Sequence, residues 1–538
     1  MRCDTLIRNA RVIDGSGNPY FFADVALTDD RIAAVVPPGR FPVENADRTI
    51  DATGKIVCPG FIDIQSHSLA PYLTDGRGLS KVTQGVTSEI LGELWTPAPF
   101  GGRRESPWSS SFSTLELDEE ARGWRRFGDW IGTYEKRGVA TNIGSFVGGA
   151  TVREYACGWD ASPADAEQTA LIRRVTEEAM EDGAFGIAPA LIYPPDCFST
   201  DEQLTASAEV VGRYGGIYIV HLRSEGDTFL ESLEATIRLS VEAKCAVEVY
   251  HFKASGRRNW PKFAQAIERI DRARAEGVDI TADMYPYPAS GTGLSVLIPL
   301  WASEGGRLFE NLRDPVLRER IRQEMLYPTS NTGDFSGDDA EGRSRAYTVL
   351  PLGFREPENR RYLGKRLSEI AEERGQDWAT AAIELLLSEN QRIATVFFSM
   401  SEENVRLGLR QPWVKVSTDA AGLDPTQQTT PGHPRGFGTY PRVLGKYVRE
   451  EQALTWEDAI RKMTSSVADR LRLKQRGLLK EGYFADVVVF DPATVADRAT
   501  FTDPHRFSVG IEHVFVNGVP VVRDSVPTNA LPGRTLRL

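Results

Sequence analysis

The sequence has few cysteines, no long apolar stretch and no excess of basic residues. Five cysteines scattered over 538 residues cannot form a disulfide framework, so the expected compartment is the reducing cytoplasm. No apolar run reaches the roughly 18–20 residues of a membrane span, and residues 1–4 do not begin a secretory signal. The 63 basic and 75 acidic residues give a net charge of −12, which argues against nucleic-acid binding. We therefore expect a globular protein with a small-molecule substrate and no membrane or nucleic-acid partner.

Both ends of the chain are predicted to consist of short strands separated by turns. Apolar runs such as 5–13 and 485–490 are bounded by Gly, Asp and Pro. Because the two ends resemble each other and differ from the middle, we expect residues 1–60 and 475–538 to form one small β-sandwich domain.

The middle of the chain, residues 61–474, alternates between predicted strands and helices. Ser162 before Pro163 indicates a helix start, and Thr200 with Gln203 has the pattern of a capping box. Successive strands are separated by about 30 residues, as a βαβ unit requires. So long a series of βα units favours an α/β fold of the (β/α)8 barrel type.

Two segments interrupt this alternation, one near 100–124 and one near 294–352. The first is rich in Ser, Gly and charged residues, and the second contains a long polar stretch. Loops of this length usually cover a functional site or lack order. We interpret both as insertions in the barrel.

The few histidines cluster at predicted strand ends. The chain has six histidines. Four of them lie at predicted strand ends or in the loops that follow such ends: His67, His221, His251 and His433. Asp419 closes another predicted strand. In a barrel of parallel strands these ends face one mouth, where active sites are built. Two imidazoles and a carboxylate there suit a divalent metal, most simply zinc.

Longer motifs extend this pattern along nearly the whole chain. They occupy residues 59–67, 80–88, 221–227, 251–256, 283–287, 417–419, 433–439 and 476–488. In these motifs and their order the chain resembles the amidohydrolase superfamily and, within it, the D-aminoacylase (N-acyl-D-amino-acid deacylase) group. The resemblance implies a metal-dependent hydrolase with a barrel and a small β domain built from both chain ends.

The resemblance also implies a tightly bound zinc ion with His221 and His251 as ligands. The group's third ligand is commonly a cysteine after the second strand, and this chain has none there. Counting back from Pro99 places Glu93 at the ligand position, whereas counting forward from Gly92 places Leu94 there. A carboxylate is a suitable zinc ligand, so Glu93 is our candidate.

A second departure concerns the His-x-His pattern that the superfamily usually has after the first strand. Here the residues are Gln65, Ser66 and His67, so His67 is the one imidazole left to serve a second metal. We expect one tight zinc site and a second site that is weak or absent.

Zinc in such a site lowers the pKa of a bound water toward about 7. The resemblance makes Asp419 the group that accepts the water's proton and then protonates the leaving amine. The substrate carboxylate needs a cation or several hydrogen-bond donors. The candidates for this role are Lys253, Tyr193, Tyr285, Arg223 and His433.

Three functions remain open from the sequence. The first is zinc-dependent hydrolysis of N-acyl-D-amino acids to a carboxylic acid and a D-amino acid. The second keeps the metal site but acts on another amide, a cyclic amide, a dipeptide or a lactone, because barrels change substrate through their loops. The third is a non-catalytic relative that binds a ligand, for which Gln65 is the best support.

Overall fold

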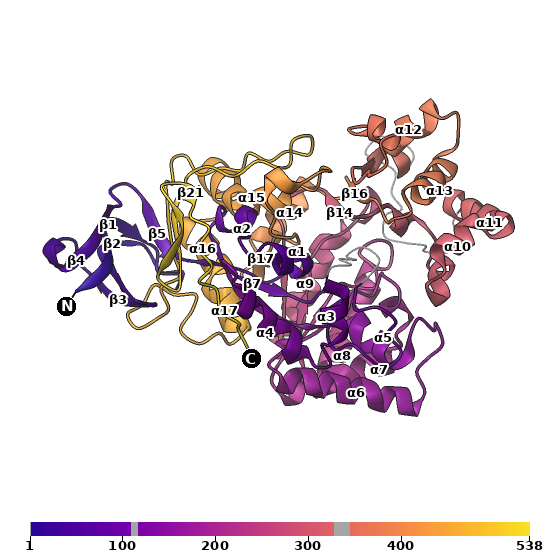
Figure 1. Cartoon of the computed structure of the whole chain (residues 1–538), viewed down its shortest axis with the longest axis horizontal. Helices are drawn as coiled ribbons and strands as arrows, with labels where there is room; N and C mark the ends of the chain where they lie inside the picture. The colour runs from indigo at the N-terminus through magenta and orange to yellow at the C-terminus, as the bar shows by residue number, and fades with distance from the viewer. Residues whose placement is uncertain (1, 109–116, 328–344) are drawn as a thin grey trace.

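A computed structural model describes residues 2–108, 117–327 and 345–538. Strands from the two chain ends form one nine-stranded sheet, ordered β21-β20-β19-β18-β5-β1-β2-β3 with β4 beside β1. The strands are β1 (Cys3–Val12), β2 (Phe21–Thr28), β3 (Arg31–Val36), β4 (Ala46–Asp51), β5 (Ile56–Pro59), β18 (Val487–Phe490), β19 (Ile511–Val516), β20 (Val519–Arg523) and β21 (Val526–Pro527). Antiparallel pairing of β5 with β18 joins the two ends. Both chain ends therefore contribute strands to one sheet, as the predicted fold class requires, and this β domain lies opposite the α10–α11 end of the molecule (Figure 1).

The middle of the chain forms the predicted (β/α)8 barrel. Its parallel strands are β6 (Phe61–Asp63), β7 (Val86–Leu91), β8 (Asn142–Ser145) with β9 (Val147–Gly148), β10 (Gly186–Ala188), β11 (Ile217–Val220), β12 (Ala246–Val249), β13 (Ile280–Met284) and β17 (Val414–Val416). A parallel bridge between Ser66 and Ala420 closes the barrel just beyond β6 and β17. All carboxyl ends of these strands therefore meet at one mouth.

Helices surround the barrel, and their starts follow local capping chemistry. They are α1 (Leu69–Thr74), α2 (Leu79–Val82), α3 (Asp118–Arg122), α4 (Phe127–Arg137), α5 (Gly149–Cys157), α6 (Ala166–Glu181), α7 (Asp201–Arg213), α8 (Phe229–Ala243), α9 (Lys262–Ala275), α14 (Glu402–Leu409), α15 (Arg435–Arg442), α16 (Trp456–Met463) and α17 (Ser465–Arg470). Thr200 and Gln203 form the predicted capping box of α7. The predicted start at Ser162 is wrong, because Asp165 caps α6 by accepting from the Gln168 backbone N–H.

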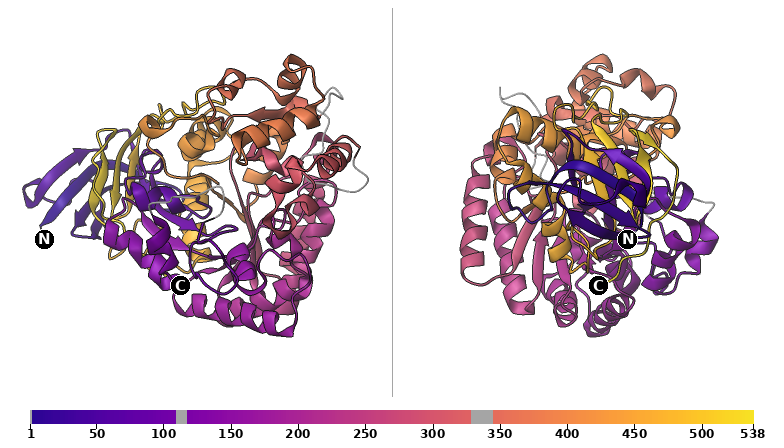
Figure 2. Two further views of the ribbon diagram at one scale, coloured as in Figure 1. Left: turned by 45° about the vertical axis from the view of Figure 1, so that its right-hand side comes forward. Right: turned by 90° about the vertical axis from the view of Figure 1, so that its left-hand side faces the viewer.

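An insertion with its own hydrophobic core lies between β13 and β17. It contains a small antiparallel sheet, β14 (Ser290–Gly293), β16 (Ala394–Phe397) and β15 (Val349–Pro351), and helices α10 (Leu308–Arg313), α11 (Pro315–Leu326), α12 (Leu367–Glu373) and α13 (Trp378–Glu389). Its hydrophobic core extends from Leu294 to Phe397. The insertion is therefore longer than the predicted 294–352, because α12 and α13 pack into the same core. Figure 2 shows the insertion beside the barrel on the side away from the β domain.

Parts of both predicted insertions, residues 109–116 and 328–344, lie outside the described residues. The two flanks of the first insertion are in contact. Trp108 packs edge-on against Trp124, and their ring centroids lie 6.2 Å apart. None of the helices in the described ranges is long and apolar enough to cross a membrane.

Candidate active site

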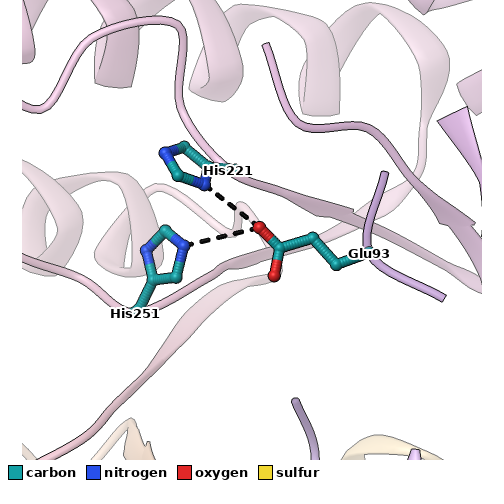
Figure 3. Close-up of side chains that lie close together, drawn as sticks. All are labelled: Glu93, His221 and His251. Atoms are coloured by element: carbon teal, nitrogen blue, oxygen red, sulfur yellow. Dashed lines mark hydrogen bonds and ion pairs between the residues drawn. The ribbon is translucent and has the colours of Figure 1, made fainter. Parts of the chain in front are cut away.

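Glu93, His221 and His251 meet at the mouth of the barrel, each just beyond the end of a strand. Glu93 Oε1 lies 3.1 Å from His221 Nδ1 and 3.5 Å from His251 Nε2 (Figure 3). The side chains are at most 6% exposed. His251 has a φ of +33°, a strained backbone conformation for a non-glycine residue. The backbone N–H of His251 donates to Asp283, which supports this conformation.

This cluster fits a zinc ion. Two imidazoles and one carboxylate form a known donor set of catalytic zinc sites, and ligands about 2.0–2.1 Å from a tetrahedral zinc lie roughly 3.3 Å apart. The two observed separations, 3.1 and 3.5 Å, bracket that value. Glu93 faces both imidazoles (Figure 3), whereas the side chain of its neighbour Leu94 has no atom that could bind a metal.

A second cluster shares Glu93 and includes His67 and Asp419. His67 Nε2 lies 2.8 Å from Asp419 Oδ1 and 3.4 Å from Glu93 Oε2. Burial alone would lower the pKa of His67, but hydrogen bonds to the two carboxylates outweigh it and raise the pKa to about 9. The structure thus brings His67, a predicted metal ligand, next to Asp419, the predicted catalytic residue.

Asp419 is also held by Arg435, whose Nη1 lies 2.7 Å from Asp419 Oδ2. Burial favours the neutral acid, but the charge of Arg435 and the hydrogen bond from His67 lower the pKa of Asp419. The carboxylate is thus ionised at neutral pH. Arg435 begins α15 within the motif at 433–439, but it was not among the predicted site residues.

A buried ion pair beneath the mouth fixes the segment that carries Asp419. Lys81 Nζ lies 2.6 Å from Asp63 Oδ2 and donates to Thr418 Oγ1 at 2.6 Å. Asp63 in turn accepts from the Thr418 backbone N–H at 2.9 Å. These bonds tie the first barrel strand to the residue directly before Asp419.

Lys253 lies in the cavity wall but is already paired. Its Nζ lies 2.5 Å from Glu225 Oε1, which also lies 2.9 Å from His251 Nδ1. Although burial opposes ionisation, the charges of Lys253 and the imidazoles lower the pKa of Glu225 to about 2. Glu225 was not predicted, although it follows His221 by four residues within one of the motifs.

The mouth opens into a cavity of about 480 Å³, lined by the predicted residues Tyr193, Tyr285 and His433. The Tyr193 hydroxyl lies 2.7 Å from Thr292 Oγ1. His433 Nε2 donates to the carbonyl of Ala289 at 3.0 Å. His433 therefore holds a loop of the cavity wall, and burial lowers its pKa well below the usual range.

Arg223 does not reach this cavity. Its guanidinium donates to the carbonyls of Cys197 and Ser199, at 2.8 and 2.9 Å, and the residue is exposed. Arg392, which was not predicted, lines the cavity instead. It lies 5.1 Å from the Tyr193 ring centroid and donates to Ser295 Oγ at 3.1 Å. No motif in the sequence pointed to Arg392, which lies well beyond the predicted insertion at 294–352.

Comparison with known proteins places this chain in a family. Residues 416–522 match the amidohydrolase family. The N-acyl-D-glutamate deacylase of Alcaligenes xylosoxydans xylosoxydans is 33% identical over 100% of this chain and 97% of its own length. The chain belongs to the D-aminoacylase family of amidohydrolases. The predicted family and enzyme class are confirmed.

Solved structures of this family superpose closely on the chain. The N-acyl-D-glutamate deacylase of Bordetella bronchiseptica, in complex with zinc and a phosphonate mimic of the tetrahedral intermediate, is 29% identical with a TM-score of 0.82 and full coverage of both chains. A D-aminoacylase with a binuclear metal centre, activated by one metal and attenuated by the second, is 30% identical with the same TM-score and coverage. A solved relative of this chain therefore binds zinc.

Proposed function

We propose that this chain hydrolyses the amide bond of N-acyl-D-amino acids, giving a carboxylic acid and a D-amino acid. The observation that carries the proposal is the buried cluster of Glu93, His221 and His251 beside Asp419, opening into a cavity with an arginine in its wall. These three residues would hold one zinc ion. The choice of N-acyl-D-amino acids rests on the relatives named above.

In this proposal Asp419 carries the proton. A zinc ion held by Glu93, His221 and His251 would supply Lewis-acid activation of water and of the amide carbonyl. Asp419, ionised because its pKa is lowered, accepts a proton from the attacking water and then donates it to the leaving amine. His67 and Arg435 each hold one of its carboxylate oxygens, so the group is oriented before substrate binds.

The substrate carboxylate would bind on the insertion side of the cavity. Arg392 is the strongest candidate, because within the described residues its side-chain contacts are a hydroxyl and an aromatic ring rather than a carboxylate. Ser290 adds a buried hydroxyl that has no hydrogen-bond partner among the residues described. Tyr193 and Tyr285 complete the wall. Lys253 would contribute less than the sequence suggests, because Glu225 neutralises it.

We further propose that one zinc is bound tightly and that the position beside His67 is weak. Among the residues that the structure describes, one imidazole serves that position, and Asp419 there is already paired with Arg435. The cytoplasmic compartment and the absence of nucleic-acid or membrane partners stay predictions from the sequence.

The proposal is tested by a panel of N-acetyl-D- and N-acetyl-L-amino acids with acidic, aliphatic and aromatic side chains. We expect hydrolysis of the D-enantiomers only. Hydrolysis of cyclic amides, dipeptides or lactones, but not of the panel, would assign the enzyme to another substrate class. Zinc binding without any hydrolysis would favour a non-catalytic ligand-binding protein.

A further inference from the structure

Gln65 is a fully buried side chain in contact with the metal-binding cluster. Its Nε2 donates to Glu93 Oε2 at 2.5 Å, and its Oε1 accepts from Ser417 Oγ at 3.4 Å. Its backbone carbonyl accepts from the Asp419 N–H at 3.0 Å. Gln65 therefore touches the candidate ligand through its side chain and the candidate base through its backbone.

This contact divides the two oxygens of Glu93 between different partners. Oε1 faces His221 and His251, whereas Oε2 accepts from Gln65 and lies 3.4 Å from His67. A hydrogen bond to an ionised carboxylate is about twice as strong as one between neutral groups. Turning the carboxylate so that Oε2 binds a metal would break this bond in a buried site.

The other potential metal ligands near Glu93 Oε2 also have partners. His67 Nε2 bonds to Asp419 Oδ1 at 2.8 Å, and Arg435 lies 2.7 Å from Asp419 Oδ2. A second cation there would face the guanidinium charge of Arg435. An amide nitrogen such as Gln65 Nε2 donates a hydrogen bond and is not a ligand that zinc uses, unlike an imidazole nitrogen.

We propose that Gln65 is a positioning residue that fixes Glu93 as a one-oxygen ligand through Oε1 and withholds Oε2 from a second metal. The inference rests on the proposed zinc-dependent function. Its consequence is that excess zinc does not attenuate this enzyme, because within the described part of the chain the second position has neither a free carboxylate oxygen nor a second imidazole.

The test compares the full-length wild type with Gln65→Met and Gln65→His. Zinc per chain is measured by elemental analysis, and zinc affinity by competition with a chromophoric chelator. Loss of an outer hydrogen bond to a ligand typically weakens metal binding about 10–100-fold. We expect one zinc in the wild type, one zinc bound about 10–100-fold more weakly in Gln65→Met by the same principle, and a second zinc equivalent in Gln65→His.

Gln203→Met is the matched control, because Gln203 is another buried amide of the barrel, bonded to Arg153 and distant in the chain from Glu93. Its zinc affinity should equal that of the wild type. Circular dichroism establishes that each variant folds, and Gln65→His keeps the test decisive if Gln65→Met does not fold.

Unchanged zinc affinity in Gln65→Met together with one zinc in Gln65→His would overturn the inference while leaving the proposed function intact. Loss of wild-type activity on addition of excess zinc would also overturn it. A wild type that binds no zinc would overturn the proposed function, and this inference with it.

Discussion

At the scale of single residues, the site depends on carboxylates whose charge is set by a few close partners. Asp419 is held ionised between His67 and Arg435, and Glu225 is held ionised beside Lys253. Both carboxylates are buried, so without those cations each would favour its neutral form. His67 and Arg435 therefore keep Asp419 ionised, so that it can act as a base. Glu225 neutralises Lys253, which leaves that cation less able to bind a substrate carboxylate.

The role of Asp419 is tested by Asp419→Asn. We expect kcat to fall by about 10²–10⁴-fold, because the amide cannot accept the proton of the attacking water. Zinc content should stay at the wild-type value, since Glu93, His221 and His251 are unchanged. Steady-state kinetics with elemental analysis of the same sample measures both, and near-normal kcat would remove Asp419 from the mechanism.

The role of Arg392 is tested by Arg392→Met. Losing a hydrogen bond to a charged group costs about 1.5–3 kcal/mol, so we expect KM to rise roughly 10–150-fold with a smaller change in kcat. Arg392→Lys should recover part of the loss. Arg223→Met is the matched control, because Arg223 lies outside the cavity and bonds to carbonyl oxygens; equal effects of the two methionine variants would contradict our assignment.

At the scale of elements, the sequence predicts the strand ends well and the long-range contacts poorly. Strand ends depend on local apolar patterns, so the sequence alone is enough to place His221, His251 and Asp419 at one mouth. Arg392 comes from the insertion and Arg435 from a helix, and their positions depend on how distant segments pack. Arg223 was misplaced because sequence does not show which way a loop side chain points.

The loop between β10 and α7 contains a buried acid, Asp196, which accepts from the backbone N–H of Ala190 at 2.8 Å. Burial raises the pKa of Asp196 to about 7, although the backbone hydrogen bond opposes the shift. In an unfolded chain the pKa is about 3.9. The folded state therefore holds an extra proton between these values, and its stability falls as the pH rises through that window.

We predict that Asp196→Asn removes this dependence. Between about pH 5 and 8 the wild type should lose roughly 1–3 kcal/mol of unfolding free energy relative to the variant. Urea denaturation at both pH values measures the difference. An equal pH dependence in the two proteins would show that Asp196 ionises normally.

At the scale of the whole molecule, the two chain ends form the β domain together, and the C-terminal end also contacts the barrel. The β domain joins them through β5 and β18, and the last residues then run back along the barrel. Gly533 N–H donates to the carbonyl of Val139, and Leu536 N–H donates to that of Ile143. Composition and strand pattern predict the shared β domain, but nothing in the final residues indicates that they return to the barrel.

We predict that deleting residues 530–538 destabilises the enzyme by at least about 3 kcal/mol. This value combines four backbone hydrogen bonds to the barrel, at about 0.5–1.5 kcal/mol each, with burial of Leu536. Deleting only residues 537–538 is the control and should change the unfolding free energy much less. Urea denaturation distinguishes them, and equal stability of the two truncated chains would contradict this account of the C-terminal segment.

The measurement that tests the central claim most directly is a titration of metal-free enzyme with zinc while hydrolysis of N-acetyl-D- and N-acetyl-L-amino acids is followed. The account predicts D-selective activity that rises in proportion to zinc and reaches its plateau at one equivalent per chain. Activity that needs two equivalents would contradict the single-metal site. Activity that is independent of zinc, or shown toward the L-enantiomers, would contradict the proposed deacylase itself.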